Sequence, residues 1–159
     1  MAKATVRLAE KGDGNALAPN LRLADRREVV ALSGESALTI LENNLWISDK
    51  CWTVVLEDEP IAIFGYIEDG DNAANIWMLG SDKINDIRWQ FLRESKNWLK
   101  KITKDFDRVW AVADIRNKLH TDWYKWLGFG ITTTLSAGPY ALPFYHIEYQ
   151  TKEQSCATP

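Results

Sequence analysis

The sequence predicts a mixed α/β (α+β) domain in which one sheet of six or seven strands is flanked by helices. Three observations carry this prediction. Residues 108–129 contain an apolar, β-favouring run, a capped helical pattern and a glycine stop. Apolar side chains alternate with a period of two from Cys51 to Ile67, which is typical of a β-hairpin. A helical pattern from Ile84 to Lys101 separates the strand-like runs 75–79 and 109–112, so these two strands are expected to be adjacent and parallel.

The helix that follows the strand at 109–112 has both of its ends marked. Asn117 occupies the position of an N-cap, and Gly128 ends the pattern. Apolar residues recur between them at spacings of three and four: Leu119, Trp123, Trp126 and Leu127. On a helical wheel Tyr124 falls at the edge of this apolar sector, beside His120. We therefore expect Tyr124 to lie outside the centre of the core and His120 to lie on the surface.

The N-terminal third is predicted to contain a first strand, at Thr5–Leu8, and then two or three helices. Asp25 and Glu28 have the spacing of a capping box, with Asp25 as the N-cap and Glu28 reaching back to it. The helix that they begin is expected to end at Gly34. Residues 36–45 repeat apolar side chains at helical spacing and predict a further helix.

The remaining strands follow from alternating apolar runs. Five are predicted, at 51–56, 61–67, 74–79, 131–135 and 144–149. The first two are expected to form a hairpin whose loop, at 58–60, is slightly longer than the tightest type. The predicted order is therefore β-α-α-β-β-β-α-β-α-β-β.

Length and composition bound the class of protein. A chain of 159 residues predicts one domain, residues 1–150, with a polar tail at 151–159. Hydrophobic residues make up 46% and charged residues 26%, as in ordinary globular proteins. No apolar run approaches the ~20 residues that a membrane helix needs, and the first ten residues lack the apolar segment of a secretory signal. We expect a protein that spans no membrane and is not secreted.

Charge and residue types argue against two further kinds of site. The net charge of −3 is unlike that of a protein that binds nucleic-acid phosphates, so nucleic acid is not expected as a partner. Cys51 and Cys156 are isolated, and His120 and His146 have no neighbours at the spacing of metal ligands. Neither a disulfide framework nor a metal site is therefore expected.

Trp89 departs from the amphipathic pattern of the long helix. It lies about 200° from Ile87 on the helical wheel and shares the polar side with Arg93, Lys96 and Lys100. We expect Trp89 to be exposed, or to be covered by another chain as an interface residue.

One segment begins at Asn117, has Tyr124 seven residues later and ends with residues 127–129. This segment resembles the signature of the GNAT superfamily of acyl-CoA-dependent N-acyltransferases. The predicted order of elements is also the order of that family. The resemblance implies that Asn117 lies near the pantetheine arm of coenzyme A and that Tyr124 protonates the leaving thiolate. Two other interpretations stay open, in which Asn117 is an N-cap and Tyr124 packs its ring with a hydrated hydroxyl.

For an enzyme of this family, the resemblance implies acetyl coenzyme A as the cofactor. It would lie between the strands at 77–79 and 109–112, with backbone groups of Met78 and Leu79 pairing the pantetheine and with Gly80 and Ser81 near the pyrophosphate. Glu68, at the end of a strand, is a candidate general base, although carboxylates at such positions are more often only solvated.

The stretch 80–88 departs from the family's pattern. Catalytic members carry Arg or Gln-x-x-Gly-x-Gly or Ala here, because bare backbone N–H groups cradle the pyrophosphate. This chain keeps only Gly80 and adds Asp82 and Asp86, which Lys83 and Arg88 offset in part. We expect coenzyme A to bind weakly or not at all, in which case the protein uses no cofactor.

Four segments, at 21–28, 60–65, 76–80 and 91–95, resemble a branch of small GNAT-like proteins of tailed bacteriophages of podovirus type. The resemblance implies a virion-associated or assembly component with little or no acetyltransferase activity. Its partners would be other phage or virion proteins or further copies of itself, in the host cytoplasm or the assembled virion. The alternative is an active acetyl-CoA-dependent N-acetyltransferase that acts on a small amine or a protein amine.

Overall fold

A single seven-stranded mixed sheet forms the centre of the protein. The structure is a computed structural model that describes residues 3–150. The strand order is β1-β2-β3-β4-β5-β7-β6. The strands are β1 (Thr5–Leu8), β2 (Lys50–Leu56), β3 (Glu59–Glu68), β4 (Ala73–Gly80), β5 (Arg108–Asp114), β6 (Gly130–Ala137) and β7 (Leu142–Gln150). The predicted fold class is confirmed, and the predicted tail at 151–159 lies outside the described residues.

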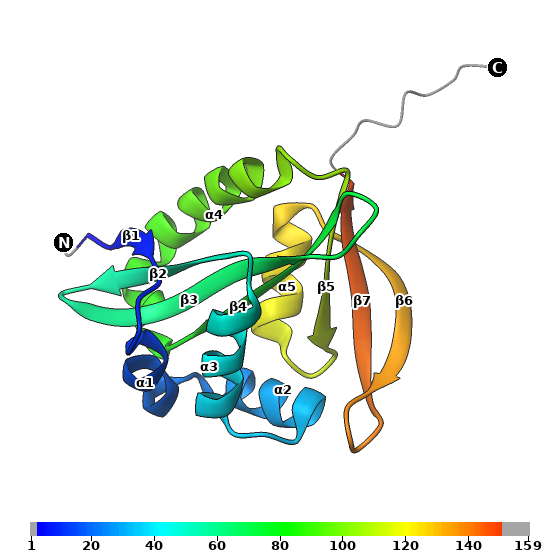
Figure 1. Cartoon of the computed structure of the whole chain (residues 1–159), viewed down its shortest axis with the longest axis horizontal. Helices are drawn as coiled ribbons and strands as arrows, with labels where there is room; N and C mark the ends of the chain where they lie inside the picture. Colours follow the sequence, from blue (N-terminus) through cyan, green and yellow to red (C-terminus); the bar gives the residue numbers. More distant parts are fainter. Residues whose placement is uncertain (1–2, 151–159) are drawn as a thin grey trace.

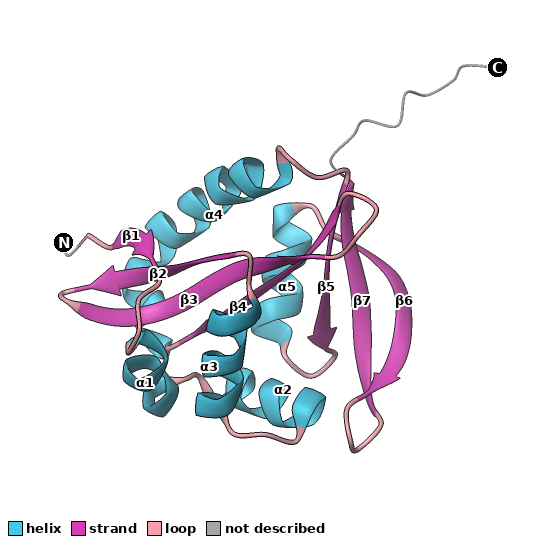
Figure 2. Ribbon diagram, viewed as in Figure 1, coloured by secondary structure: helices cyan, strands magenta, loops and turns pink. Residues whose placement is uncertain are grey.

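Helices cover both faces of the sheet (Figures 1 and 2). The α-helices are α1 (Asp13–Leu17), α2 (Leu23–Ser33), α3 (Ala37–Ile47), α4 (Arg88–Thr103) and α5 (Lys118–Leu127), and the 3-10 helices are η1 (Ala18–Asn20) and η2 (Asp82–Ile87). Helices α4 and α5 lie on one side, and α1, α2 and α3 lie on the other. Among the described residues no helix is long and apolar enough to cross a membrane.

Strands β4 and β5 are adjacent and parallel, as the crossover helix α4 predicts. Their ladder is short, because only Ala73–Asn75 pair with Arg108–Trp110. On the other sides, β4 pairs with β3 from Ala74 to Gly80, and β5 pairs with β7 along its whole length. The two central strands therefore stay in one sheet while they separate from each other beyond Asn75.

Local boundaries differ from the prediction in two places. The β2–β3 turn consists of Glu57 and Asp58, both with positive φ (50° and 62°), so the loop is the tightest hairpin type and not a longer one. Neither residue is a glycine or asparagine, the usual signal for such a turn, so this turn type was not evident from the sequence. The long helix α4 begins at Arg88, because residues 82–87 form the 3-10 helix η2.

The orientation of two helices also differs from the prediction. Asp25 is not the N-cap of α2 but lies in its first turn, fully buried. In α5 the N-cap Asn117 and the terminal Gly128 are confirmed, but His120 and Tyr124 are buried while Leu119 is 53% exposed. The prediction ranked positions by apolarity alone. In the folded protein a polar network holds His120 inward and turns Leu119 towards solvent.

Candidate functional site

The site lies where β4 and β5 separate. Because their ladder ends at Asn75 and Trp110, the backbone groups at the far ends of the two strands need other partners. These ends are Gly80 on β4 and Asp114 on β5. Strand alternation places the N–H and C=O of Met78 on the same side as those of Gly80, towards β5.

Helix α2 supplies the partners through two carboxylates, which we call the carboxylate bridge. Asp25 Oδ2 accepts a hydrogen bond from the N–H of Gly80 at 2.9 Å. Glu28 Oε2 accepts one from the N–H of Asp114, also at 2.9 Å. The two acids are three residues apart and therefore lie on one face of α2. The carboxylate bridge thus occupies the gap between the two separated strands.

Asn117 joins the two halves of the carboxylate bridge. Its side-chain amide donates to Asp25 Oδ1 at 3.2 Å and to Glu28 Oε2 at 3.3 Å. Its Oδ1 accepts the N–H of His120 at 3.3 Å, which is the N-cap bond of α5. Both donors of the amide are used inside the protein. The predicted cap is confirmed, and no donor remains for a ligand.

His120 completes the buried network. Its Nδ1 lies 3.1 Å from Glu28 Oε1, and its Nε2 lies 3.3 Å from Asp25 Oδ1 in a contact without hydrogen-bond geometry. Arg22 pairs with Asp25 through Nε and Nη2, at 2.9–3.1 Å. Burial lowers the pKa of His120, but the charges of Asp25 and Glu28 outweigh burial and raise it. When His120 is protonated, it and Arg22 together balance the two carboxylates.

The junction between β4 and α4 is closed by its own hydrogen bonds. The N–H of Ser81 donates to Ile61 C=O at 2.8 Å. The N–H groups of Lys83 and Ile84 donate to Ser81, to its Oγ at 3.3 Å and to its C=O at 3.2 Å. A Cβ on Gly80 would meet Ile84 Cδ1 at 2.3 Å, so the Ile84 side chain fills the space above Gly80. The Lys83 ammonium, a possible anion partner, is paired with Glu59.

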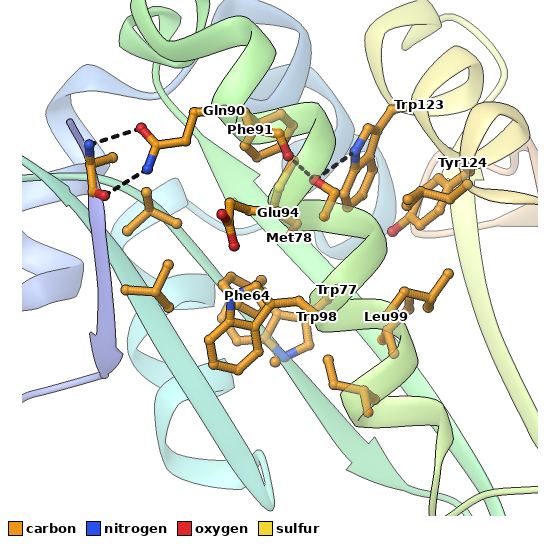
Figure 3. A pocket seen from close by; sticks show the side chains of 18 of the residues that line it. Phe64, Trp77, Met78, Gln90, Phe91, Glu94, Trp98, Leu99, Trp123 and Tyr124 are labelled. Atoms are coloured by element: carbon orange, nitrogen blue, oxygen red, sulfur yellow. Dashed lines mark hydrogen bonds between the residues drawn. The ribbon is translucent and has the colours of Figure 1, made fainter. Parts of the chain in front are cut away.

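An apolar pocket of about 70 Å³ lies on the other side of the separation, between the sheet and α4 (Figure 3). Most of its walls are aliphatic or aromatic. Glu94 points into it from α4 (Figure 3). Gln90 closes one end, because its side chain bonds with both the N–H and the C=O of Ala4, at 3.0 and 2.8 Å.

The Tyr124 hydroxyl faces this pocket from α5 (Figure 3). Only 3% of the residue is exposed, and its hydroxyl forms no hydrogen bond within residues 3–150. Burial raises the pKa of Tyr124, and the charges of Glu28 and Asp25 act in the same direction. The hydroxyl is therefore protonated at neutral pH.

The structure brings most of the predicted site residues together and leaves two apart. Four of them lie around the strand separation: Met78, Gly80, Asn117 and Tyr124. Two more lie next to it, Ser81 and Leu79, and the Leu79 side chain is in the core on the α1–α3 side. Glu68 pairs with Ala74, six residues and therefore about 20 Å along β4 from Gly80. The predicted exposure of Trp89 is confirmed at 77%, and its role as an interface residue remains a prediction.

Sequence reasoning missed the centre of the network. Asp25 and Glu28 were assigned to a capping box, and His120 was assigned to the surface. One signal was present, because Arg22, Asp25 and Glu28 repeat at intervals of three and so share one face of a helix. No group of three potential metal ligands occurs within the part of the chain that the structure describes.

Solved structures that superpose on this chain include GNAT-family acetyltransferases. A GNAT-family acetyltransferase from Bacillus anthracis superposes with a TM-score of 0.72 at 14% identity, over 96% of this chain and 98% of that one. Ard1 from Thermoplasma volcanium gives 0.71 at 12% identity, over 94% and 99%. An acetyltransferase from Bacillus subtilis in complex with CoA gives 0.64 at 10% identity, over 93% and 99%. The chain therefore has the GNAT fold. No protein-family profile matches the sequence, and no curated protein matches it.

Proposed function

We propose that this is a GNAT-fold protein of a tailed bacteriophage, of podovirus type, that has little or no acetyltransferase activity and serves as a virion-associated or assembly component. The observation that carries the loss of activity is the closed junction between β4 and α4. The phage role rests on the resemblance of the segments 21–28, 60–65, 76–80 and 91–95.

The residues present do not fit the pyrophosphate of coenzyme A. An anion site at such a junction needs free backbone N–H groups and positive charge. Here the N–H groups of Ser81, Lys83 and Ile84 are used within the protein. Asp82 and Asp86 are exposed on the same stretch. A like charge a few ångströms away costs about 1 kcal/mol in water and several times more at a protein-like dielectric, so phosphate binding is opposed.

Exposed tryptophans support the role in an assembly. Trp89 is 77% exposed at the start of α4, and Trp46 is 88% exposed near the end of α3. Tryptophan is enriched at the energetic centres of protein interfaces. The partners are other virion proteins or further copies of this chain, in the host cytoplasm or in the particle.

Calorimetric titration with acetyl coenzyme A tests the first half of the proposal. We expect little heat at micromolar protein. The variant carrying Asp82→Ala and Asp86→Ala should bind more tightly than the parent if the carboxylates oppose the phosphates. Low-micromolar binding by the parent, together with acetyl transfer to an amine, would overturn the proposal. The second half of the proposal, the role in the virion, predicts that the protein is present in purified particles of the phage that encodes it.

The second candidate is an active acetyl-CoA-dependent N-acetyltransferase. It is favoured by the separation of β4 and β5 and by the Tyr124 hydroxyl, which faces the pocket beside them and has no hydrogen-bond partner among residues 3–150. Release of free thiol from acetyl coenzyme A in the presence of small amines and peptides tests it. Activity that Tyr124→Phe abolishes, while Tyr140→Phe leaves it unchanged, would establish this alternative. Tyr140 is a suitable control because it is exposed, on the turn between β6 and β7.

A further inference from the structure

Positive charge is concentrated on the outer side of α4. The helix carries five Lys or Arg residues and one Glu, a net charge of +4, whereas the whole chain carries −3. The rest of the chain therefore carries −7. The prediction that nucleic acid is not a partner was based on the net charge of the whole chain. That net charge is the sum of a positive helix α4 and a negative remainder, so it does not reveal the basic surface on α4.

The cations are aligned along the helix. Five residues at spacings of three or four form what we call the α4 ridge: Trp89, Arg93, Lys96, Lys100 and Lys104. All five are exposed. From Trp89 to Lys104 the ridge is about 22 Å long at 1.5 Å per residue. It therefore presents about one cation per helical turn in a straight line.

These cations have almost no carboxylate partners. Within the described residues only Arg93 forms a salt bridge, with Glu94 at the long distance of 4.0 Å. Glu94 is the only acid of α4, and its side chain lines the pocket (Figure 3) while 42% of it stays exposed, so it offsets only one of the cations of the helix. The outer side of the ridge is thus free to meet an external anion.

Exposed indole rings accompany the cations. Lys96 Nζ lies 4.1 Å from the ring centre of Trp126 on α5, which is 42% exposed. Arg88 lies over Trp89 at 5.6 Å. A surface that alternates cations with exposed flat rings is typical of proteins that bind single-stranded nucleic acid, where bases stack on the rings and cations track the backbone.

We propose that the α4 ridge is a binding surface for single-stranded nucleic acid, with phosphates on Arg93, Lys96, Lys100 and Lys104 and with bases stacked on Trp89 and Trp126. A duplex fits less well, because its bases are already stacked and cannot lie on the indoles. An anionic membrane also fits less well, because the apolar side of α4 is packed against the sheet and only scattered rings remain to enter lipid. The proposal is independent of whether the protein acetylates anything, and it assigns Trp89 to bases, which leaves Trp46 on α3 for protein partners.

Fluorescence anisotropy with a labelled oligothymidylate of about 20 nucleotides tests the proposal. We expect binding that weakens with salt, with a slope of log K against log salt of about −3 for four phosphate contacts. The variant with Lys96→Glu and Lys100→Glu should lose at least tenfold in affinity. Trp89→Ala should lose about tenfold, as expected for one stacked base.

A matched control carries Lys11→Glu and Arg27→Glu. It changes the net charge equally, but both residues are exposed away from the ridge, Arg27 on α2 and Lys11 in the turn before α1. It should lose much less than tenfold, and the thermal unfolding midpoints of all variants should agree with the parent.

Any of the following results would overturn the proposal: no binding at about 50 mM salt, equal losses in the control and the ridge variant, duplex binding as tight as single-strand binding, or tighter binding to anionic vesicles than to the oligonucleotide. Competition experiments with free coenzyme A and with inorganic phosphate show whether the ridge prefers a nucleic-acid polymer or a small phosphate ligand. Displacement of the oligonucleotide by stoichiometric coenzyme A would assign the cations to a cofactor and also overturn the proposal.

Discussion

Glu28 accepts a hydrogen bond from the backbone N–H of Asp114, 86 residues later in the chain. Through this bond a helix near the N-terminus closes the end of a central strand. Asp25 does the same for Gly80 on the neighbouring strand. Acids that would be solvated on an ordinary helix therefore replace the missing part of the β4–β5 ladder.

The first prediction concerns this replacement. Glu28→Ala should lower the free energy of unfolding by about 3–5 kcal/mol, because it leaves the Asp114 N–H buried without a partner and removes one of the two carboxylates that face His120. Glu28→Gln should cost less, because its carbonyl can still accept from Asp114. Urea unfolding measures both variants. Glu35→Ala, in the exposed turn after α2, should stay within about 0.5 kcal/mol of the parent. If Glu28→Ala also changes the free energy of unfolding by no more than about 0.5 kcal/mol, the carboxylate bridge adds little stability.

A second prediction concerns pH. The folded state raises the pKa of His120 above its unfolded value of about 6.5, so the folded state binds the proton more tightly. This stabilisation is fully present below pH of about 6.5 and is lost as pH rises through the folded-state pKa. The free energy of unfolding should therefore fall with rising pH on the alkaline side of 6.5. In His120→Gln this fall should disappear, whereas His146→Gln, outside the network, should keep it. Identical pH profiles for parent and His120→Gln would refute the assignment.

The third prediction concerns the closed junction. Gly80→Ala places a Cβ 2.3 Å from Ile84 Cδ1 and should cost about 1–3 kcal/mol through overpacking. In the double variant with Ile84→Ala, the loss of unfolding free energy should be smaller than the sum of the losses in the two single variants. A double-mutant cycle measures this difference. Gly130→Ala is the control, because a Cβ there meets nothing within 4 Å. Strict additivity of the two changes would show that Ile84 does not fill the space above Gly80.

The fourth prediction concerns Tyr124. Its ring packs against Phe129 and Trp123, at 5.1 and 5.0 Å between ring centres, while its hydroxyl has no hydrogen-bond partner among the described residues. Tyr124→Phe should therefore change the free energy of unfolding by less than about 0.5 kcal/mol. Tyr124→Ala should cost about 3–5 kcal/mol, because it leaves a cavity in the core. A large loss in Tyr124→Phe, measured by urea unfolding, would reveal a bond from the hydroxyl that holds the fold.

The sequence by itself determined the elements and their order. Local interactions set the N-cap Asn117, the helix end at Gly128 and the apolar pattern of α4, because they involve residues within a few positions of each other. Such features can be predicted from the sequence without knowledge of the fold. The parallel neighbours β4 and β5 follow from the crossover connection through α4. The sequence also shows that residues 80–88 retain a single glycine, but it did not predict the hydrogen bonds of Ser81 that close the β4–α4 junction.

Only the tertiary structure decided what Asp25, Glu28 and His120 do. As a local pattern the two acids fit a capping box, and His120 fits the polar edge of a helix. Apart from Arg22, which pairs with Asp25, the side-chain partners of these three residues lie 55 to 92 residues away along the chain. A hydrogen bond of this kind exists only because the sheet brings the ends of two separated strands against one face of α2. Periodicity within a helix reports which residues share a face, but what that face meets depends on the packing of the whole chain.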